Sequence, residues 1–443
     1  MRKSLVLPTL VFSGLFSSLT RADLLIALKY YDQKDYAKAQ QEFSALLPLG
    51  NETAAFNLAV MHQEGQGTAV DLAKTQAYLQ LAYSLGDNKA ERLAKNLFNK
   101  LPPAEQQRAT TSFEQLVTLV QINNPALDEQ PEVKMPEVVS RKEPMYPKKS
   151  FSRGLFGFAD ARFLIDEQGK VQAVEIVNEY PKGIFSQATK TAISAWTYQS
   201  TGQKQIGRVS LSYTLGGVVL NKNRIEKLIQ EHKLFDYSLA GSPEHQYLLG
   251  SLLRLVNNNS YLKIEEDLAK FDVTDFNLPA ELFNQSYMAP VALAGFKGQA
   301  KVATDEQGKV TAVLDSNGQS KTQHESILLG QKLHNKVKAG VYAITADFKG
   351  KAVINKVLTL SPYYSSNYWL LTAAKNGHKE AQRLMAARST EWESYLLQQN
   401  DAVIQTWAGV SKILKGEQEQ GQLLLDKAVA QQYEVAAELK AVL

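Results

Sequence analysis

Six histidines are the side chains of this sequence best suited to bind a metal ion or to transfer a proton near neutral pH. None belongs to a His-Glu-x-x-His motif or to another metal-ligand spacing, so we predict no metal site. His62 lies at the end of a predicted helix, where we expect a surface or loop position. The full set is His62, His232, His245, His324, His334 and His378.

Motifs for nucleophilic catalysis and phosphate binding are also missing from the sequence. It contains neither a Gly-x-Ser-x-Gly elbow nor a P-loop. Gly65 and Gly67 form a Gly-x-Gly pair, but it follows a predicted helix rather than a strand, which argues against a dinucleotide site. The adjacent carboxylates Glu265 and Glu266 fit a solvated helix face. We therefore predict a protein that is not an enzyme, with no catalytic residues and no cofactor.

The composition is that of a globular protein whose partner is not nucleic acid. The 443 residues correspond to about three domains. Lys and Arg number 49 against 45 Asp and Glu, and Arg2, Lys3 and Arg21 lie in the first 22 residues. The remaining 46 basic and 45 acidic residues nearly balance, whereas a phosphate-binding protein needs a dominant basic face. With no cysteine, the chain has neither disulfides nor thiolate metal ligands.

The N-terminus has the pattern of a secretory signal. Two basic residues precede the apolar stretch Leu5–Leu19, and Thr20-Arg21-Ala22 offers a cleavage site. The alternative is an uncleaved membrane anchor, but the apolar run is shorter than the ~20 residues that span a bilayer, and it contains Pro8. We predict cleavage after residue 22 and a soluble protein outside the cytoplasm.

Hydrophobic periodicity indicates an α+β fold with helical ends and two β-rich segments. Helical spacing gives way after residue 143 to strand alternation, in the order strand, strand, helix, strand. In the second β-rich segment we expect two hairpins with a short helix at 326–337 between them. The predicted division is signal peptide 1–22, helical repeats 23–122, linker 123–143, first β-rich domain 144–218, helical segment 219–275, second β-rich domain 276–362 and C-terminal helical repeats 363–443.

The two helical ends resemble each other. Tyr78, Ala82, Gly86, Ala90 and Leu93 match Trp369, Ala373, Gly377, Ala381 and Leu384 at a constant offset. Residues 54–90, with their Gly-x-Gly loop and Ala-x-x-x-Gly ending, resemble a Sel1-like repeat, a relative of the tetratricopeptide repeat. The resemblance implies paired helices that act as a protein-interaction scaffold; the alternative is that they only support the fold.

The first β-rich domain resembles the C-terminal domain of TonB-type energy transducers. The resemblance rests on the order and spacing of one set of residues: Tyr146, Pro147, Gly157, Phe163, Asp166, Gly169, Val171, Phe185 and Trp196. It implies a three-stranded antiparallel sheet with a helix across one face. It also implies a periplasmic protein that binds an extended peptide of an outer-membrane receptor.

An unpaired sheet edge can accept an extended peptide as another strand. The candidate edge is the stretch from residue 206 to residue 215, in which Ile206, Val209, Leu211 and Tyr213 are expected to face the core. The alternative is that flanking helices cover this edge. The predicted partner-binding residues are Ile206, Gly207, Arg208, Val209, Ser210, Leu211, Ser212 and Tyr213.

The chain departs from the family in ways that bear on function. The N-terminal segment has no histidine for proton coupling, and the linker is short for a transducer that must reach across the periplasm. We expect a periplasmic protein that binds a receptor or other envelope protein by strand addition, with the helical repeats as scaffold. The alternatives are a membrane-anchored energy transducer and a purely structural scaffold.

The hexapeptide DEQGKV occurs twice, at Asp166–Val171 and at Asp305–Val310. Acid, polar residue and glycine are typical of a tight turn between strands, so both aspartates are predicted to form turns. The second copy lacks the Tyr-Pro opening, and no Phe–Trp helix follows it. This favours an independent hairpin with the same turn, with a decayed duplicate of the first domain as the alternative.

Overall fold

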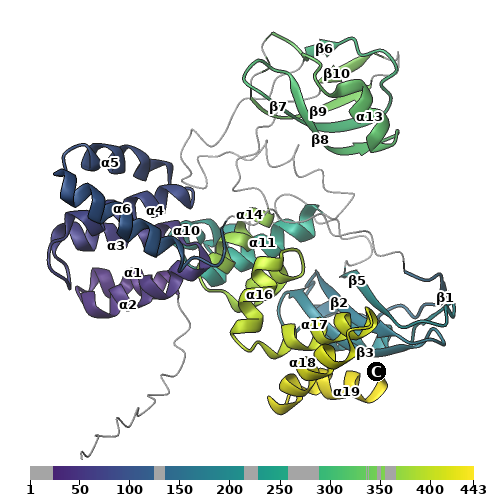
Figure 1. Ribbon diagram of the computed structural model, residues 1–443. Coiled ribbons are helices and arrows are strands. Elements are labelled where there is room, and N and C mark those ends of the chain that lie inside the picture. Colours follow the sequence, from purple (N-terminus) through teal and green to yellow (C-terminus); the bar gives the residue numbers. More distant parts are fainter. Residues whose placement is uncertain are drawn as a thin grey trace, which may run out of the picture.

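The computed structural model describes residues 23–123, 135–213, 228–257, 289–335, 337, 339–346, 351–354 and 366–443. Helices lie at both ends of the chain and two β units lie between them, so the predicted α+β class is confirmed (Figure 1). Within these ranges no helix is both long and apolar enough to cross a bilayer. The predicted signal peptide, residues 124–134 of the linker, and Glu265 and Glu266 lie outside the described residues.

The N-terminal helices begin at side-chain caps that the sequence supplies. Asp23, Asp35, Asn51, Asp71 and Asp87 each accept a hydrogen bond from a backbone amide of the helix that follows. The helices are α1 (Leu24–Asp32), α2 (Tyr36–Leu46), the short 3-10 helix η1 (Leu47–Leu49), α3 (Glu52–Glu64), α4 (Leu72–Ser84), α5 (Asn88–Phe98) and α6 (Pro103–Val117). The α3–α4 pair is compatible with the Sel1-like resemblance.

Helices from three distant parts of the chain share one hydrophobic core, which we call the helical body. Leu58, Tyr247 and Trp392 all belong to this core. Buried amides connect the same parts: the Asn51 amide donates to Asn376 Oδ1 at 2.7 Å, and the Asn376 amide donates to Gln246 Oε1 at 2.8 Å. Besides α1–α6, the body contains α11 (Pro243–Asn257), α14 (Ser366–Lys375), α15 (Lys379–Ala386) and α16 (Thr390–Gln398). Helix α10 (Leu234–Leu239) packs against α11.

The first β unit is a three-stranded antiparallel sheet in the order β3-β2-β5. Its strands are β2 (Gly157–Ile165), β3 (Val171–Tyr180) and β5 (Gln205–Tyr213), with α7 (Lys148–Ser152) before them and α8 (Ser186–Ile193) between β3 and β5. A separate pair is formed by β1 (Val138–Ser140) and β4 (Thr197–Tyr198). Part of the predicted linker is therefore a strand that pairs with this unit.

Both faces of this sheet are covered. On one face Ala161 and Phe163 of β2 pack with α8. On the other face Leu164 packs against Trp407 and Leu425 of the C-terminal helices, which lie beside the sheet in Figure 1. These are α17 (Ala402–Leu414), α18 (Gln418–Ala430) and α19 (Glu434–Val442).

The second β unit has its own core and repeats the connectivity of the first. The hairpin β7–β8, helix α13 and strand β9 give the order β8-β7-β9, as β2–β3, α8 and β5 give β3-β2-β5. Two further strands extend the second sheet beyond β9, giving β6-β10-β9-β7-β8. The elements are β6 (Ala289–Val291), β7 (Gln299–Thr304), β8 (Val310–Asn317), α13 (Lys321–Leu328), β9 (Gly340–Ala346) and β10 (Ala352–Ile354).

The two DEQGKV turns are the same structure. Asp166 Oδ1 accepts from the amides of Gln168 and Lys170 at 3.0 and 2.8 Å, and Asp305 Oδ1 accepts from Gln307 and Lys309 at 3.0 and 2.9 Å. The second turn is followed by a helix, although not by the Phe–Trp helix of the first. It therefore belongs to a complete strand-strand-helix-strand unit, and that its hairpin is independent of the first domain stays a prediction. A helix is expected at 326–337, but the helix in this segment is α13, which ends at Leu328. Gly330, two residues later, has φ 75°.

Trp407 tests the packing of the C-terminal helices on the sheet. Its side chain is 4% exposed, and the Arg162 guanidinium lies over its ring at 4.3 Å. We expect Trp407→Ala to lower the free energy of unfolding by about 3–5 kcal/mol in urea denaturation followed by circular dichroism. The matched control is Leu423→Ala on α18, whose side chain is 56% exposed and should cost less than about 0.5 kcal/mol. Equal losses for the two variants would contradict this packing.

Candidate functional site

Strand β5 forms one edge of the first β unit; within the described residues it pairs with β2 alone. The Asp166 amide donates to Lys170 O at 2.9 Å, so even-numbered residues of β2 direct their backbone groups to β3 and odd-numbered residues direct theirs to β5. In the register Ala161↔Val209, the odd-numbered residues of β5 bond to β2. The residues whose backbone groups point to the open side are Ile206, Arg208, Ser210 and Ser212.

The side chains of β5 alternate between two environments. Val209, Leu211 and Tyr213 pack in the core on the α8 side. Ile206 packs on the opposite face, against the cluster that contains Leu164. The expectation that all four share one face is wrong, because side chains alternate with a period of two and residue 206 is even-numbered. Gly207 leaves room for the Phe163 ring, since a Cβ there would lie 2.3 Å from a ring carbon.

The turn residues of the sequence motif shape the start of the hairpin. Gly169 has φ 83°, and a Cβ there would lie 2.0 Å from Tyr198 O. Asp166 Oδ2 also accepts from the side-chain amide of Gln172 at 2.9 Å. Burial raises the pKa of Asp166, but its hydrogen bonds hold that pKa below the usual value. Val171 begins β3 and is buried.

Aromatic residues of the motif pack against the inner side of β5. Phe185 stacks on Tyr213 with ring centroids 4.2 Å apart, and Tyr146 meets both rings edge-on. Pro147 precedes α7, and Gly157 begins β2 beside Tyr180 O, where a Cβ would lie 1.7 Å away. The aromatic residues of the motif therefore support β5 on the face of the sheet that packs against α8.

Trp196 and Phe163 complete this core. Trp196 Nε1 donates to Lys142 O at 2.8 Å, and the Arg141 guanidinium lies over the indole at 4.5 Å. Phe163 lies edge-on to Trp196 and stacks on Tyr198. The motif residues are thus placed in the core and turn, and the predicted partner-binding residues are those of β5 itself.

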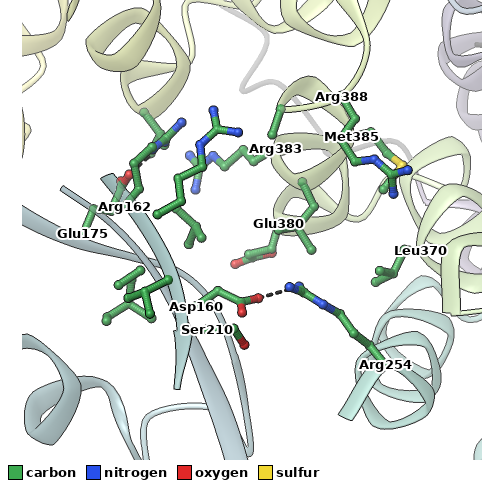
Figure 2. A pocket seen from close by; sticks show the side chains of 18 of the residues that line it. Asp160, Arg162, Glu175, Ser210, Arg254, Leu370, Glu380, Arg383, Met385 and Arg388 are labelled. Carbon is green, nitrogen blue, oxygen red and sulfur yellow. Dashed lines mark hydrogen bonds and ion pairs between the residues drawn. The ribbon is translucent and has the colours of Figure 1, made fainter. Parts of the chain in front are cut away.

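A pocket of about 540 Å³ lies between the other face of the sheet and the helices. Figure 2 shows Arg162, Glu175 and Ser210 on the sheet side, and Arg254, Arg383 and Arg388 on the helical side. Arg208 of β5 also lines it, so the pocket reaches the sheet edge. Sequence reasoning did not find this pocket; the signal for it was the pair of charges at Asp160 and Arg162 inside an otherwise apolar strand.

Three of the pocket arginines are paired with carboxylates. Arg162 contacts Glu175 at 2.8 Å, Arg254 pairs with Asp160, and Arg383 contacts Asp401 at 3.0 Å. Glu175 also accepts from the Tyr433 hydroxyl. Burial raises the pKa of Asp160, and Arg254 opposes that shift. Arg388 donates to Asn367 Oδ1 at 3.1 Å instead of to a carboxylate.

Arg208 is exposed beside the pocket and has no carboxylate partner among the described residues. Desolvation lowers the pKa of its guanidinium, and the charge of Arg162 lowers it further. Arg162 lies directly opposite Arg208 on β2, where like charges repel.

Within the described part of the chain, no three or more His, Asp or Glu side chains are grouped so that they could hold a metal ion. His62 is buried, with 3% exposure, and stacks on Tyr78 at 5.5 Å, so the expected surface position is wrong. Helix α4 packs over the end of α3, and burial lowers the pKa of His62. This contact joins residues from two helices, which periodicity within one helix does not reveal.

The family described as "Gram-negative bacterial TonB protein C-terminal" matches residues 142–215. Residues 142–215 are a TonB C-terminal domain. Protein TonB of Klebsiella pneumoniae is 26% identical over 87 residues, which cover 19% of this chain and 35% of that protein. Protein TonB of Yersinia enterocolitica is 28% identical over 69 residues, covering 16% of this chain and 27% of that protein.

The matched segment therefore spans about a third or less of the length of these TonB proteins. Among solved structures, the solution structure of the Pseudomonas aeruginosa TonB C-terminal domain aligns with 20% of this chain and 94% of its own, at 16% identity and a TM-score of 0.18.

Asp401 fixes one wall of the pocket beside the TonB domain. Its buried carboxylate caps α17 through the Ile404 amide and contacts Arg383 and Lys379 of α15 at 3.0 and 3.2 Å. Burial opposes ionisation, but the two cations and the amide hold the pKa of Asp401 below its usual value of 3.8. A carboxyl with a lowered folded pKa stabilises the fold above its unfolded pKa, and this contribution is lost as pH falls through the folded pKa.

We expect Asp401→Asn to lower the free energy of unfolding by about 2 kcal/mol at neutral pH. Because Asn has no charge to lose, the difference from wild type should shrink as pH falls below about 4. Urea denaturation across this pH range measures it. The control is Asp426→Asn, which breaks an exposed pair with Lys440 and should change little at any pH. A pH-independent loss for Asp401→Asn would contradict the ionic role.

Proposed function

We propose that this protein is a non-catalytic envelope protein of a Gram-negative bacterium that binds an extended peptide of an outer-membrane receptor along β5 of its TonB domain. The peptide adds to the sheet as a fourth strand. The helical body is the scaffold that holds this domain and presents other surfaces for interaction. The single observation that carries the proposal is the regular outer edge of β5.

Of the two edges of the sheet, β5 is the one suited to pairing. It pairs with β2 over nine residues without a register shift. Strand β3 has two register shifts against β2 and Ala173 at φ 45°, and bulges of this kind hinder further pairing. Tyr247 of α11 donates a hydrogen bond to Asn178 of β3, and Tyr433, which precedes α19, donates one to Glu175 of β3.

The second β unit provides an internal precedent for an added strand. Its strand β9 occupies the position of β5, and it pairs on its outer side with β10, with Thr345 opposite Val353. Like β5 with β2, β9 pairs with β7 without a register shift. The fold thus accepts an antiparallel strand on this edge, which supports the same geometry at β5 with a strand from another protein.

Proline at an outward-facing position tests strand addition. We expect Ser210→Pro to reduce binding of receptor-derived peptides at least tenfold, because proline removes a backbone donor on the open side of β5. Peptides from the N-termini of outer-membrane receptors encoded in the same genome serve as probes in fluorescence polarisation. Ser210→Ala is the matched control and should bind normally, since it keeps the amide and removes only the hydroxyl.

Val209→Pro separates folding from binding. The Val209 amide points to β2, so this variant should lower the unfolding temperature. Ser210→Pro should unfold close to the temperature of Ser210→Ala, which equally lacks the hydroxyl that bonds to Asp160. Peptide affinity that is equal in wild type and in folded Ser210→Pro would contradict docking on this edge.

A further inference from the structure

The basic pocket opens onto the edge proposed to bind the peptide. Arg208 and Ser210 belong both to the pocket lining and to the outward-facing residues of β5. The opposite wall comes from α15 and the residues after it, including Arg383 and Arg388, which Figure 2 shows on the helical side. A strand added to β5 would therefore lie along the mouth of this pocket.

The pocket has more positive than negative charge. Its lining contains five arginines and three carboxylates, a formal charge of +2. The surplus lies at Arg208 and Arg388, which have no carboxylate partner among the residues described. The Nε of Arg162, which lines the same space, is buried without a hydrogen-bond acceptor. The neighbouring guanidiniums of Arg162 and Arg208 repel each other, and an added carboxylate would relieve that repulsion.

The direction of side chains in a docked strand determines which of its residues reach these arginines. Residues directly opposite each other on paired strands point to the same face of the sheet. The side chains of Arg208 and Ser210 lie on the pocket face, whereas Val209 and Leu211 lie on the α8 face. Peptide residues opposite Arg208 and Ser210 would therefore point toward the pocket, and those between them would not.

We propose that this pocket is a specificity subsite that receives an acidic side chain of the docked peptide. The carboxylate enters the pocket beside Arg208, and Arg383 and Arg388 lie on the opposite wall. The proposal rests on strand addition at β5 and adds a sequence requirement to it. The preferred peptide has an acidic residue on the pocket face and apolar residues at the alternating positions beside Val209.

A glutamate scan tests the subsite. The probes are peptides of about ten residues, derived from one receptor peptide that binds, with a single Glu or Gln placed at each position in turn. In fluorescence polarisation we expect Glu to bind roughly fivefold to twentyfold more tightly than Gln at alternate positions, and equally at the positions between them. The preference should weaken at high salt.

Matched protein variants assign the preference to the pocket. In Arg208→Gln/Arg388→Gln the Glu preference should fall below about twofold, while the Gln peptides keep their affinity. The control is Arg153→Gln, which removes an exposed guanidinium from α7's end in the same domain, outside the pocket lining, and should keep the full preference. Circular dichroism and thermal unfolding check that both variants remain folded.

The outcomes distinguish the subsite from the docking mode. A Glu preference with a period of two that depends on Arg208 and Arg388 supports the subsite. Equal binding of Glu and Gln peptides, still blocked by Ser210→Pro, overturns the subsite and leaves strand addition standing. A Glu preference that Ser210→Pro does not affect overturns strand addition. The failure of every peptide to bind overturns it as well. Either result also overturns the subsite, because the subsite is defined by a peptide docked on β5.

Discussion

Strand β2 is buried on both of its faces, and the rest of the structure depends on this constraint. One face of the strand requires α8, and the other requires the C-terminal helices. Asp160 and Arg162 lie on the second face, where isolated charges would be costly. Asp160 pairs with Arg254 of α11, and Arg162, which pairs with Glu175 within the sheet, also lies over the ring of Trp407 of α17. Both charges therefore tie the sheet to the helices. The faces are thereby occupied, which leaves an edge as the place where a peptide can pair.

The features that could be predicted from the sequence are those encoded by neighbouring residues. The turn at Asp166 and Gly169 needs a short acidic side chain and a residue at positive φ, and the residue types that meet both needs can be read from the sequence. The strand-strand-helix-strand order and the helix starts at Asp35 and Asp71 are likewise local. These local rules account for the TonB domain and for the general α+β architecture.

What could not be predicted depends on contacts between distant segments. The burial of His62 requires α4, and the pocket requires strands near residue 160 and helices near residue 385 to meet. The face of Ile206 could have been assigned from parity alone, since it differs by an odd number from Val209. Arg162 carried a signal of a different kind: a long cation inside an apolar strand must find an anion or an aromatic ring, and here it finds both Glu175 and Trp407.

The helical body is assembled from parts of the chain on either side of both β units, and this has a consequence for the order of assembly. The contact between Asn51 and Asn376 closes a loop of more than three hundred residues, and contacts of such separation form late. Synthesis proceeds from the N-terminus, so the side-chain amide of Asn51, at the start of α3, gains its partner Asn376 only after α14 has been made. The TonB domain must also wait for Trp407 before its second face is covered. A chain that stops before α15 would lack the wall that carries Arg383 and Arg388, so the pocket beside the peptide edge is a feature only of molecules in which α15 and the residues after it have docked.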